Sequence, residues 1–102
     1  MVGKLLKILH SNISIKDEDI HTDDRWLGKG YGIMSPEVLD AINLLAKTDG
    51  ILTDPTYSGK SIAGLIELTR QNNFEPNSNI LYLHTGGHPN IFAYESLLNT
   101  SS

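Results

Sequence analysis

Three glycine-bearing segments carry the side chains best suited to chemistry. They are Gly28-Lys29-Gly30-Tyr31-Gly32, Tyr57-Ser58-Gly59-Lys60-Ser61 and His84-Thr85-Gly86-Gly87. Glycines let backbone N–H groups approach an anion or a flat ring. The phenols of Tyr31 and Tyr57 can donate or accept a proton, and Thr85 adds a hydroxyl. The residues alone leave open the alternative that these segments are tight connections with no ligand.

One of these segments has a partial phosphate-binding signature. Gly59-Lys60-Ser61 resembles the end of a P-loop, but the full motif needs a glycine five residues earlier, where the sequence has Asp54. A carboxylate there repels phosphate, and Pro55 stiffens the loop. A small nucleotide-binding protein therefore stays only as a third hypothesis.

Metal and hydrolase sites find little support. His84 and His88 are four residues apart, but two glycines between them interrupt any helix, so they do not form a zinc pair. The sequence has no Gly-x-Ser-x-Gly motif. It has no cysteine, which excludes disulfide scaffolds, thiolate nucleophiles and cysteine-rich metal sites. We predict no metal site.

The composition is that of a single globular domain. The chain has 102 residues, and eight Lys plus Arg against twelve Asp plus Glu give a net charge of −4. This balance argues against nucleic acid and against an anionic membrane surface as partners. The longest apolar runs fall far short of the roughly 20 residues that span a bilayer. We expect a cytoplasmic protein with a short polar tail at 100–102.

Apolar spacing and breakers predict alternating helices and strands. A Ser35-Pro36-Glu37 start favours a helix that continues to about Lys47 and stops at Gly50. Short apolar runs at 51–53 and 80–83 are typical of buried strands. The other predicted elements are helices at 3–11, 58–72 and 90–98, with a brief strand around Ile20 and His21.

The order αβαβα indicates an α/β fold with three αβα layers and parallel strands. The strand–helix–strand unit at 51–83 is a parallel pair with a right-handed crossover. Two or three strands do not complete a parallel sheet, which needs cover on both faces and more strands beside it. The pattern therefore predicts part of a larger domain.

These segments together resemble a known family. Gly30-Tyr31-Gly32, the run 54–60, Ala63-Gly64-Leu65, His84-Thr85-Gly86-Gly87 and Phe92-Ala93-Tyr94 resemble the carboxyl-terminal third of D-cysteine desulfhydrases. These are pyridoxal-phosphate enzymes related to 1-aminocyclopropane-1-carboxylate deaminases. The resemblance implies the tryptophan synthase β-like fold, with residues 1–102 as the carboxyl-terminal part of its large domain.

The resemblance also implies roles for single residues. Tyr57 lies over the cofactor and substrate, and Tyr31 reaches the substrate side, so both are expected to be catalytic. Thr85 is expected to hydrogen-bond the pyridine nitrogen of pyridoxal phosphate, with Ser58 and Gly86 as further cofactor contacts. Deaminases of the family resemble Tyr-Glu-Gly-Lys and His-Leu-Gly-Gly at these loops. Ser58 and Thr85 match the desulfhydrase pattern instead, which favours elimination of D-cysteine to pyruvate, sulfide and ammonia.

The departures from the family are equally informative. None of the lysines matches the family's Schiff-base lysine, and the phosphate-cradling glycine loop has no counterpart here. We therefore expect a fragment of the lyase that is inactive alone and works with its missing amino-terminal part or as a homodimer, on a small D-amino acid. The alternatives are a 1-aminocyclopropane-1-carboxylate deaminase and a non-enzymatic module that docks on an amino-terminal companion. The lysines concerned are Lys4, Lys7, Lys16, Lys29, Lys47 and Lys60.

Overall fold

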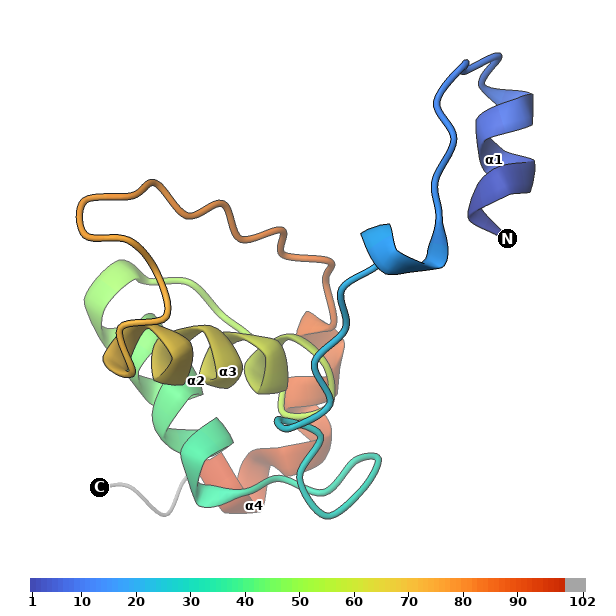
Figure 1. Cartoon of the computed structure of the whole chain (residues 1–102). Helices are drawn as coiled ribbons and strands as arrows, with labels where there is room; N and C mark the ends of the chain where they lie inside the picture. The colour runs from blue at the N-terminus through green and yellow to red at the C-terminus, as the bar shows by residue number, and fades with distance from the viewer. Residues whose placement is uncertain (99–102) are drawn as a thin grey trace.

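The computed structural model describes residues 1–98, and their regular structure is helical. The polar tail at 100–102 lies outside the described residues. The elements, shown in Figure 1, are the α-helices α1 (Val2–Ile8), α2 (Pro36–Asp49), α3 (Ser58–Arg70) and α4 (Glu95–Leu98) and the 3-10 helices η1 (Asp17–Asp19) and η2 (His88–Tyr94).

Helices α2 and α3 form as predicted, each with bounds within two residues of the expected ones. Pro36 at the first position of α2 suits the helical φ, and Glu37 complements the positive end of the helix. The hydrogen bond from Ser35 lowers the pKa of Glu37, with a further contribution from the backbone N–H of Glu37. Gly50 ends α2 in the left-handed region at φ +67°, and its N–H donates to the Ala46 carbonyl at 3.2 Å.

The core lies where α2 packs against α3. Within residues 1–98, the buried hydrophobic cluster comes from these two helices: Val38, Ala41, Ile42, Ile62 and Ala63. The helices approach closely because Gly59 has no side chain, and a β-carbon there would lie 3.0 Å from the Ile42 Cδ1 atom. This small core fixes α3 as the platform for the glycine-bearing loops.

The predicted strands at 51–53 and 80–83 do not form within residues 1–98, so the predicted three αβα layers are absent from this part of the chain. A strand needs a neighbour to bond its backbone groups, and these two segments make no ladder with each other. Side chains hold the second segment instead: the Tyr82 hydroxyl donates to the Ser58 carbonyl at 3.2 Å. Leu81 remains 95% exposed, so the predicted cover on both faces is also absent.

The ends of the chain differ from prediction in smaller ways. The first helix is shorter than expected, Val2–Ile8, has no buried residue and stands apart from the body (Figure 1). The brief strand predicted around Ile20 and His21 does not form, and the 3-10 turn Asp17–Asp19 precedes it. The last predicted helix is split into His88–Tyr94 and Glu95–Leu98. The extended first segment contributes to an elongated outline of 53 × 34 × 26 Å.

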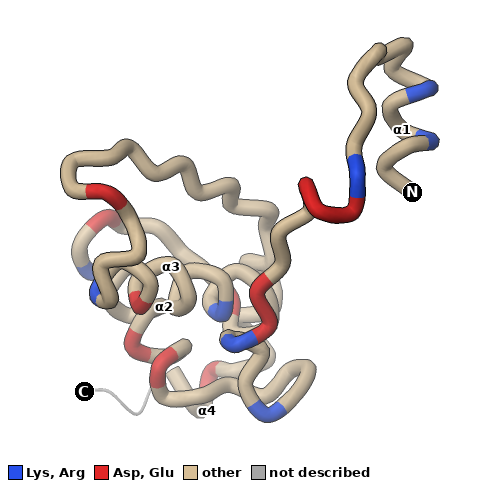
Figure 2. Tube along the Cα trace, in the orientation of Figure 1, with Lys and Arg blue, Asp and Glu red and all other residues tan. Residues whose placement is uncertain are grey.

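Charges are distributed along the chain in both signs, as Figure 2 shows. The basic residues of α1, Lys4 and Lys7, are followed by the acidic run of η1, Asp17, Glu18 and Asp19. Over residues 1–98, none of the helices has the length and apolar character needed to cross a bilayer.

Candidate functional site

The start of α3 is organised by one buried carboxylate. Asp54 is 0% exposed and accepts hydrogen bonds from the backbone N–H groups of Thr56, Tyr57 and Ser58 at 2.8–2.9 Å. The Ser58 hydroxyl adds a bond of 2.7 Å to the same carboxylate. Burial alone raises the pKa of Asp54, but the Ser58 hydroxyl and the three N–H donors outweigh burial and hold the pKa below its ordinary value. Asp54 therefore fixes the backbone that carries Tyr57.

The same carboxylate holds the loop that carries Thr85. The Asn90 side-chain amide lies 3.4 Å from Asp54 Oδ2. A β-carbon on Gly87 would lie 2.7 Å from the Asp54 Cγ atom, so only glycine allows this approach. Gly87 also has φ +99°, which L-residues rarely adopt. Two of the three predicted functional loops thus meet at Asp54.

Lys60 joins the third loop to α3. Its ammonium donates to the carbonyl oxygens of Leu27 and Gly30, both at 2.7 Å. A third bond to this loop comes from the Tyr94 hydroxyl, which donates to the Gly32 carbonyl at 2.6 Å. The loop that contains Tyr31 is therefore held against the body by side chains from distant parts of the sequence.

The two predicted catalytic tyrosines meet directly. The hydroxyls of Tyr31 and Tyr57 share a short hydrogen bond, and their rings pack edge to face with centroids 5.9 Å apart. The hydrogen bond with Tyr31 raises the pKa of Tyr57, and partial burial and neighbouring charges add to the increase. Tyr57 is therefore a protonated phenol at neutral pH and can donate a hydrogen bond.

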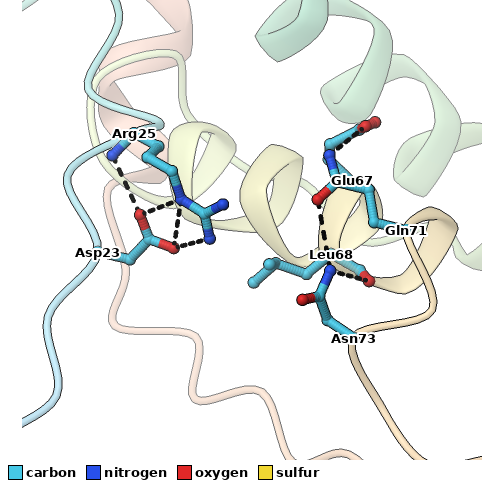
Figure 3. Close-up of polar contacts among 6 residues, drawn as sticks. All are labelled: Asp23, Arg25, Glu67, Leu68, Gln71 and Asn73. Atoms are coloured by element: carbon cyan, nitrogen blue, oxygen red, sulfur yellow. Dashed lines mark hydrogen bonds and ion pairs between the residues drawn. The ribbon is translucent and has the colours of Figure 1, made fainter.

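Tyr57 and Thr85 line one cleft of about 500 Å³. The Thr85 hydroxyl makes no hydrogen bond with any residue in 1–98, although its neighbours are well bonded. At the edge of the cleft, Arg25 forms a bidentate pair with Asp23 at 2.6 and 2.9 Å (Figure 3), and this pair lowers the pKa of Asp23. The other residues that line the cleft are Trp26, Leu27, Thr56, Lys60, Ser61 and Gly64.

The remaining predicted site residues are not among those that line this cleft: Tyr31, Ser58 and Gly86. The Ser58 hydroxyl faces Asp54, and Ser58 is almost fully buried, so its predicted contact with the cofactor stays a prediction. The Gly86 N–H donates to His84 Nδ1 at 3.1 Å, while His84 Nε2 lies 2.9 Å from the Leu52 carbonyl. His84 thereby ties the Thr85 loop to residue 52. The His88 ring stacks on that of His84 with centroids 4.7 Å apart.

Two residues of the site were missed by sequence reasoning. The sequence places Asp54 at the position where a P-loop has glycine, and Lys60 in the partial P-loop and among the lysines that do not match the Schiff-base position, but it gives neither residue a structural role. A signal for Asp54 was present, because Asp before Pro, close to a helix start, is typical of a side chain that caps the first N–H groups. No local pattern indicated Lys60, because its partners lie about thirty residues earlier.

The residues present fit the ring of the pyridoxal phosphate that the family resemblance implies, but the lysine that lines the cleft does not fit its aldehyde. The free Thr85 hydroxyl and the Tyr57 ring suit the edge and face of a pyridine. The aldehyde needs a free lysine amine. Lys60 lines the cleft, but its amine is engaged by two carbonyls. Within residues 1–98, the lysine that lines this cleft therefore offers no free amine to the aldehyde.

Comparison with known proteins identifies the family of the chain. Residues 4–86 match the family model described as pyridoxal-phosphate dependent enzyme. A probable 1-aminocyclopropane-1-carboxylate deaminase of Cryptococcus neoformans is 44% identical over 87% of this chain. The 1-aminocyclopropane-1-carboxylate deaminases of Burkholderia vietnamiensis and Burkholderia multivorans are each 45% identical over 81% of it. The chain spans about a quarter of the length of these relatives. It belongs to the family of pyridoxal-phosphate-dependent enzymes.

Proposed function

We propose that this chain forms one wall of the active site of a lyase that converts D-cysteine and water to pyruvate, sulfide and ammonia. The observation that carries the proposal is the position of Thr85, an exposed residue that lines the same cleft as Tyr57 and makes no hydrogen bond through its hydroxyl to residues 1–98. The family of the chain supplies the cofactor class.

Thr85 is assigned to the pyridine nitrogen. Pyridoxal phosphate, when bound, withdraws electrons from the α-carbon of an amino-acid substrate. A hydroxyl offers the ring nitrogen a hydrogen bond without the negative charge that would hold a proton there. Modest electron withdrawal is enough when the β-substituent is a thiolate, because a thiolate leaves readily.

Tyr57 and Tyr31 are assigned to proton handling on the substrate side. At neutral pH Tyr57 is a protonated phenol whose hydroxyl bonds that of Tyr31, and we assign it to supplying a proton or a hydrogen bond to the substrate. Tyr31 orients that phenol. The buried Asp54, which bonds the Tyr57 backbone N–H and approaches Gly87, keeps Tyr57 and Thr85 at a fixed separation.

A second candidate is deamination of 1-aminocyclopropane-1-carboxylate. The observation in its favour is the name of the relatives, which are 43–45% identical to this chain. The two candidates share the cleft, the cofactor class and the tyrosine pair. They differ in what the enzyme places at the ring nitrogen, and there the Thr85 hydroxyl supports the first.

A chimeric enzyme tests the choice. The 83 residues of the Burkholderia vietnamiensis relative that match this chain are replaced by the residues of this chain. We expect sulfide release from D-cysteine to rise and ammonia release from 1-aminocyclopropane-1-carboxylate to fall relative to the parent. A chimera that keeps the parent's preference favours the second candidate, and one that binds the cofactor but acts on neither substrate argues against both.

We further propose that residues 1–98 complete their fold against a companion segment, the missing amino-terminal part. The extended runs at 51–53 and 80–83 would pair there as parallel strands within αβα layers, covering the exposed Leu81 and Leu83 side chains. The test mixes this chain with the Burkholderia vietnamiensis relative lacking its matching 83 residues. A stable one-to-one complex is expected in size-exclusion chromatography. A homodimer of this chain that ignores the companion contradicts the proposal.

A further inference from the structure

Lys60 is a buried lysine, and burying its ammonium costs free energy unless hydrogen bonds replace the lost water. The residue is 7% exposed, and no carboxylate within residues 1–98 forms an ion pair with its ammonium. Moving an unpaired ammonium out of water costs several kcal/mol unless hydrogen bonds replace the lost hydration. The carbonyls of Leu27 and Gly30 provide that replacement at 2.7 Å each. The Lys60 ammonium therefore bonds the loop that contains Leu27 and Gly30.

That loop has little internal structure. Gly28, Gly30 and Gly32 all have positive φ, between +68° and +149°, where the chain is stabilised by no helix or strand. Its own turn bond, from the Ile33 N–H to the Gly30 carbonyl, is long at 3.3 Å. The path of the loop therefore depends on the two bonds from Lys60 and on the bond from Tyr94 to the Gly32 carbonyl.

Tyr31 depends on this loop for its position. The side chain is 79% exposed, and within residues 1–98 its one hydrogen bond is to the Tyr57 hydroxyl. An exposed ring has several staggered positions open to it, so the backbone must be fixed for the two hydroxyls to meet. Lys60 bonds the carbonyl of Gly30, the residue directly before Tyr31.

We propose that Lys60 is a positioning residue that holds the loop at 27–32 so that the hydroxyl of Tyr31 meets the hydroxyl of Tyr57. Lys60 and Tyr57 lie at the same end of α3, one turn apart, so a single helix end sets both partners of the tyrosine pair. The geometric part of this inference stands on the contacts alone. Its value for catalysis rests on the proposed function.

The test reads the tyrosine pair in the free chain by nuclear magnetic resonance. The chain has four tyrosines, which are labelled with ¹³C at Cζ and assigned by single Tyr→Phe variants. In the wild type, we expect the pKa of Tyr57 to lie above the ordinary tyrosine value, because the hydrogen bond with Tyr31 raises it. Lys60→Met keeps an apolar stem and removes the charge. In this variant we expect the pKa of Tyr57 to fall toward the ordinary tyrosine value. Tyr31→Phe is expected to give the same shift, and the double variant no further shift.

The chain offers a matched control and a chemical rescue. Lys29→Met removes an exposed lysine from the same loop and should leave the Tyr57 titration unchanged. Since the chain has no cysteine, Lys60→Cys can be aminoethylated at that position alone, in denaturant before refolding, which restores an ammonium on a side chain of nearly the same length. The pKa of Tyr57 should lie near the ordinary tyrosine value before this modification and above that value after it. This comparison also serves if Lys60→Met does not fold, as judged by far-ultraviolet circular dichroism.

The outcomes separate this inference from the proposed function. An unchanged Tyr57 titration in Lys60→Met, or an equal change in Lys29→Met, overturns the inference whatever the substrate of the enzyme is. A restored titration after aminoethylation supports it even where the chimeric enzyme shows no activity toward D-cysteine.

Discussion

The carboxylate of Asp54 lies against the backbone of Gly87, so close that a β-carbon on Gly87 would stand 2.7 Å from the Asp54 Cγ atom. Asp54 stands just before α3, and Gly87 is the last residue of the segment 84–87 that carries Thr85. This contact brings the tyrosine side and the threonine side of the cleft together. A side chain at position 87 must therefore separate them.

Gly87→Ala is expected to destabilise the chain by about 2–4 kcal/mol, because overpacking adds to the cost of a positive φ. Gly86→Ala is the matched control: it has a similar φ, +104°, but nothing lies within 4 Å of its β-carbon position. The control should cost only about 1–2 kcal/mol. Urea unfolding followed by circular dichroism measures both. Equal losses in the two variants would show that the contact with Asp54 does not matter.

Asp54→Asn is expected to remove stability at neutral pH, by about 1–3 kcal/mol, because an amide cannot accept every N–H bond that the carboxylate accepts. The pKa of Asp54 is lower in the folded chain than in the unfolded chain, where it is about 3.9. Its contribution is therefore present above pH 4 and is lost as the pH falls through the folded-state pKa.

The gap in stability between the wild type and Asp54→Asn should thus narrow below pH 4. Asp40→Asn, which changes an exposed carboxylate of α2, is the control and should leave stability nearly unchanged. A gap that stays constant down to pH 2 contradicts the assigned role of Asp54.

The helices were predictable from the sequence because local signals define them. The Ser35-Pro36-Glu37 start and Gly50 mark α2, and the core residues of α2 and α3 repeat at helical spacing. The strands at 51–53 and 80–83 were predicted from apolar runs, but a run of apolar residues does not provide the neighbouring strand on which a ladder depends.

The candidate site was predictable only in part, for the same reason. Tyr31, Tyr57 and Thr85 stood out by type and by their glycine neighbours, and the structure brings the two tyrosines into contact and places Thr85 in the cleft of Tyr57. The Lys60 bonds and the contact between Asp54 and Gly87 join residues about thirty positions apart. Such contacts follow from the tertiary fold and leave no local pattern.

In the chimeric enzyme, Thr85→Val is expected to lower turnover of D-cysteine about tenfold, the effect of one lost hydrogen bond to the ring nitrogen. Thr85→Ser keeps the hydroxyl and should retain most activity. Tyr57→Phe should cost more, about 10²-fold or above, since it removes a proton donor. Steady-state sulfide release measures all three variants. Rates equal to the parent chimera in both Thr85→Val and Tyr57→Phe would show that the assigned roles are wrong.

Gly64→Ala is expected to push Trp26 out of the cleft wall. A β-carbon at position 64 would lie 2.7 Å from the Trp26 Cδ1 atom, and this overlap, worth about 1–3 kcal/mol, outweighs the gain of about 0.5–1 kcal/mol for alanine in a helix. Trp26 is the single tryptophan of the chain, so its fluorescence reports the change as a red shift. Gly3→Ala, with open space around it, is the control and should leave the emission unchanged.

The central claim is that this chain lines the ring side of a pyridoxal-phosphate site whose lysine amine comes from elsewhere. The most direct test adds pyridoxal phosphate to the purified chain, follows visible absorption, and reduces the mixture with borohydride before peptide mapping. Lys60 is the lysine that lines the cleft within residues 1–98, and two carbonyls hold its amine. We therefore expect no lysine to carry the label in stoichiometric amount. A stoichiometric label on one lysine, Lys60 above all, would contradict the claim and show that the chain builds a cofactor site by itself.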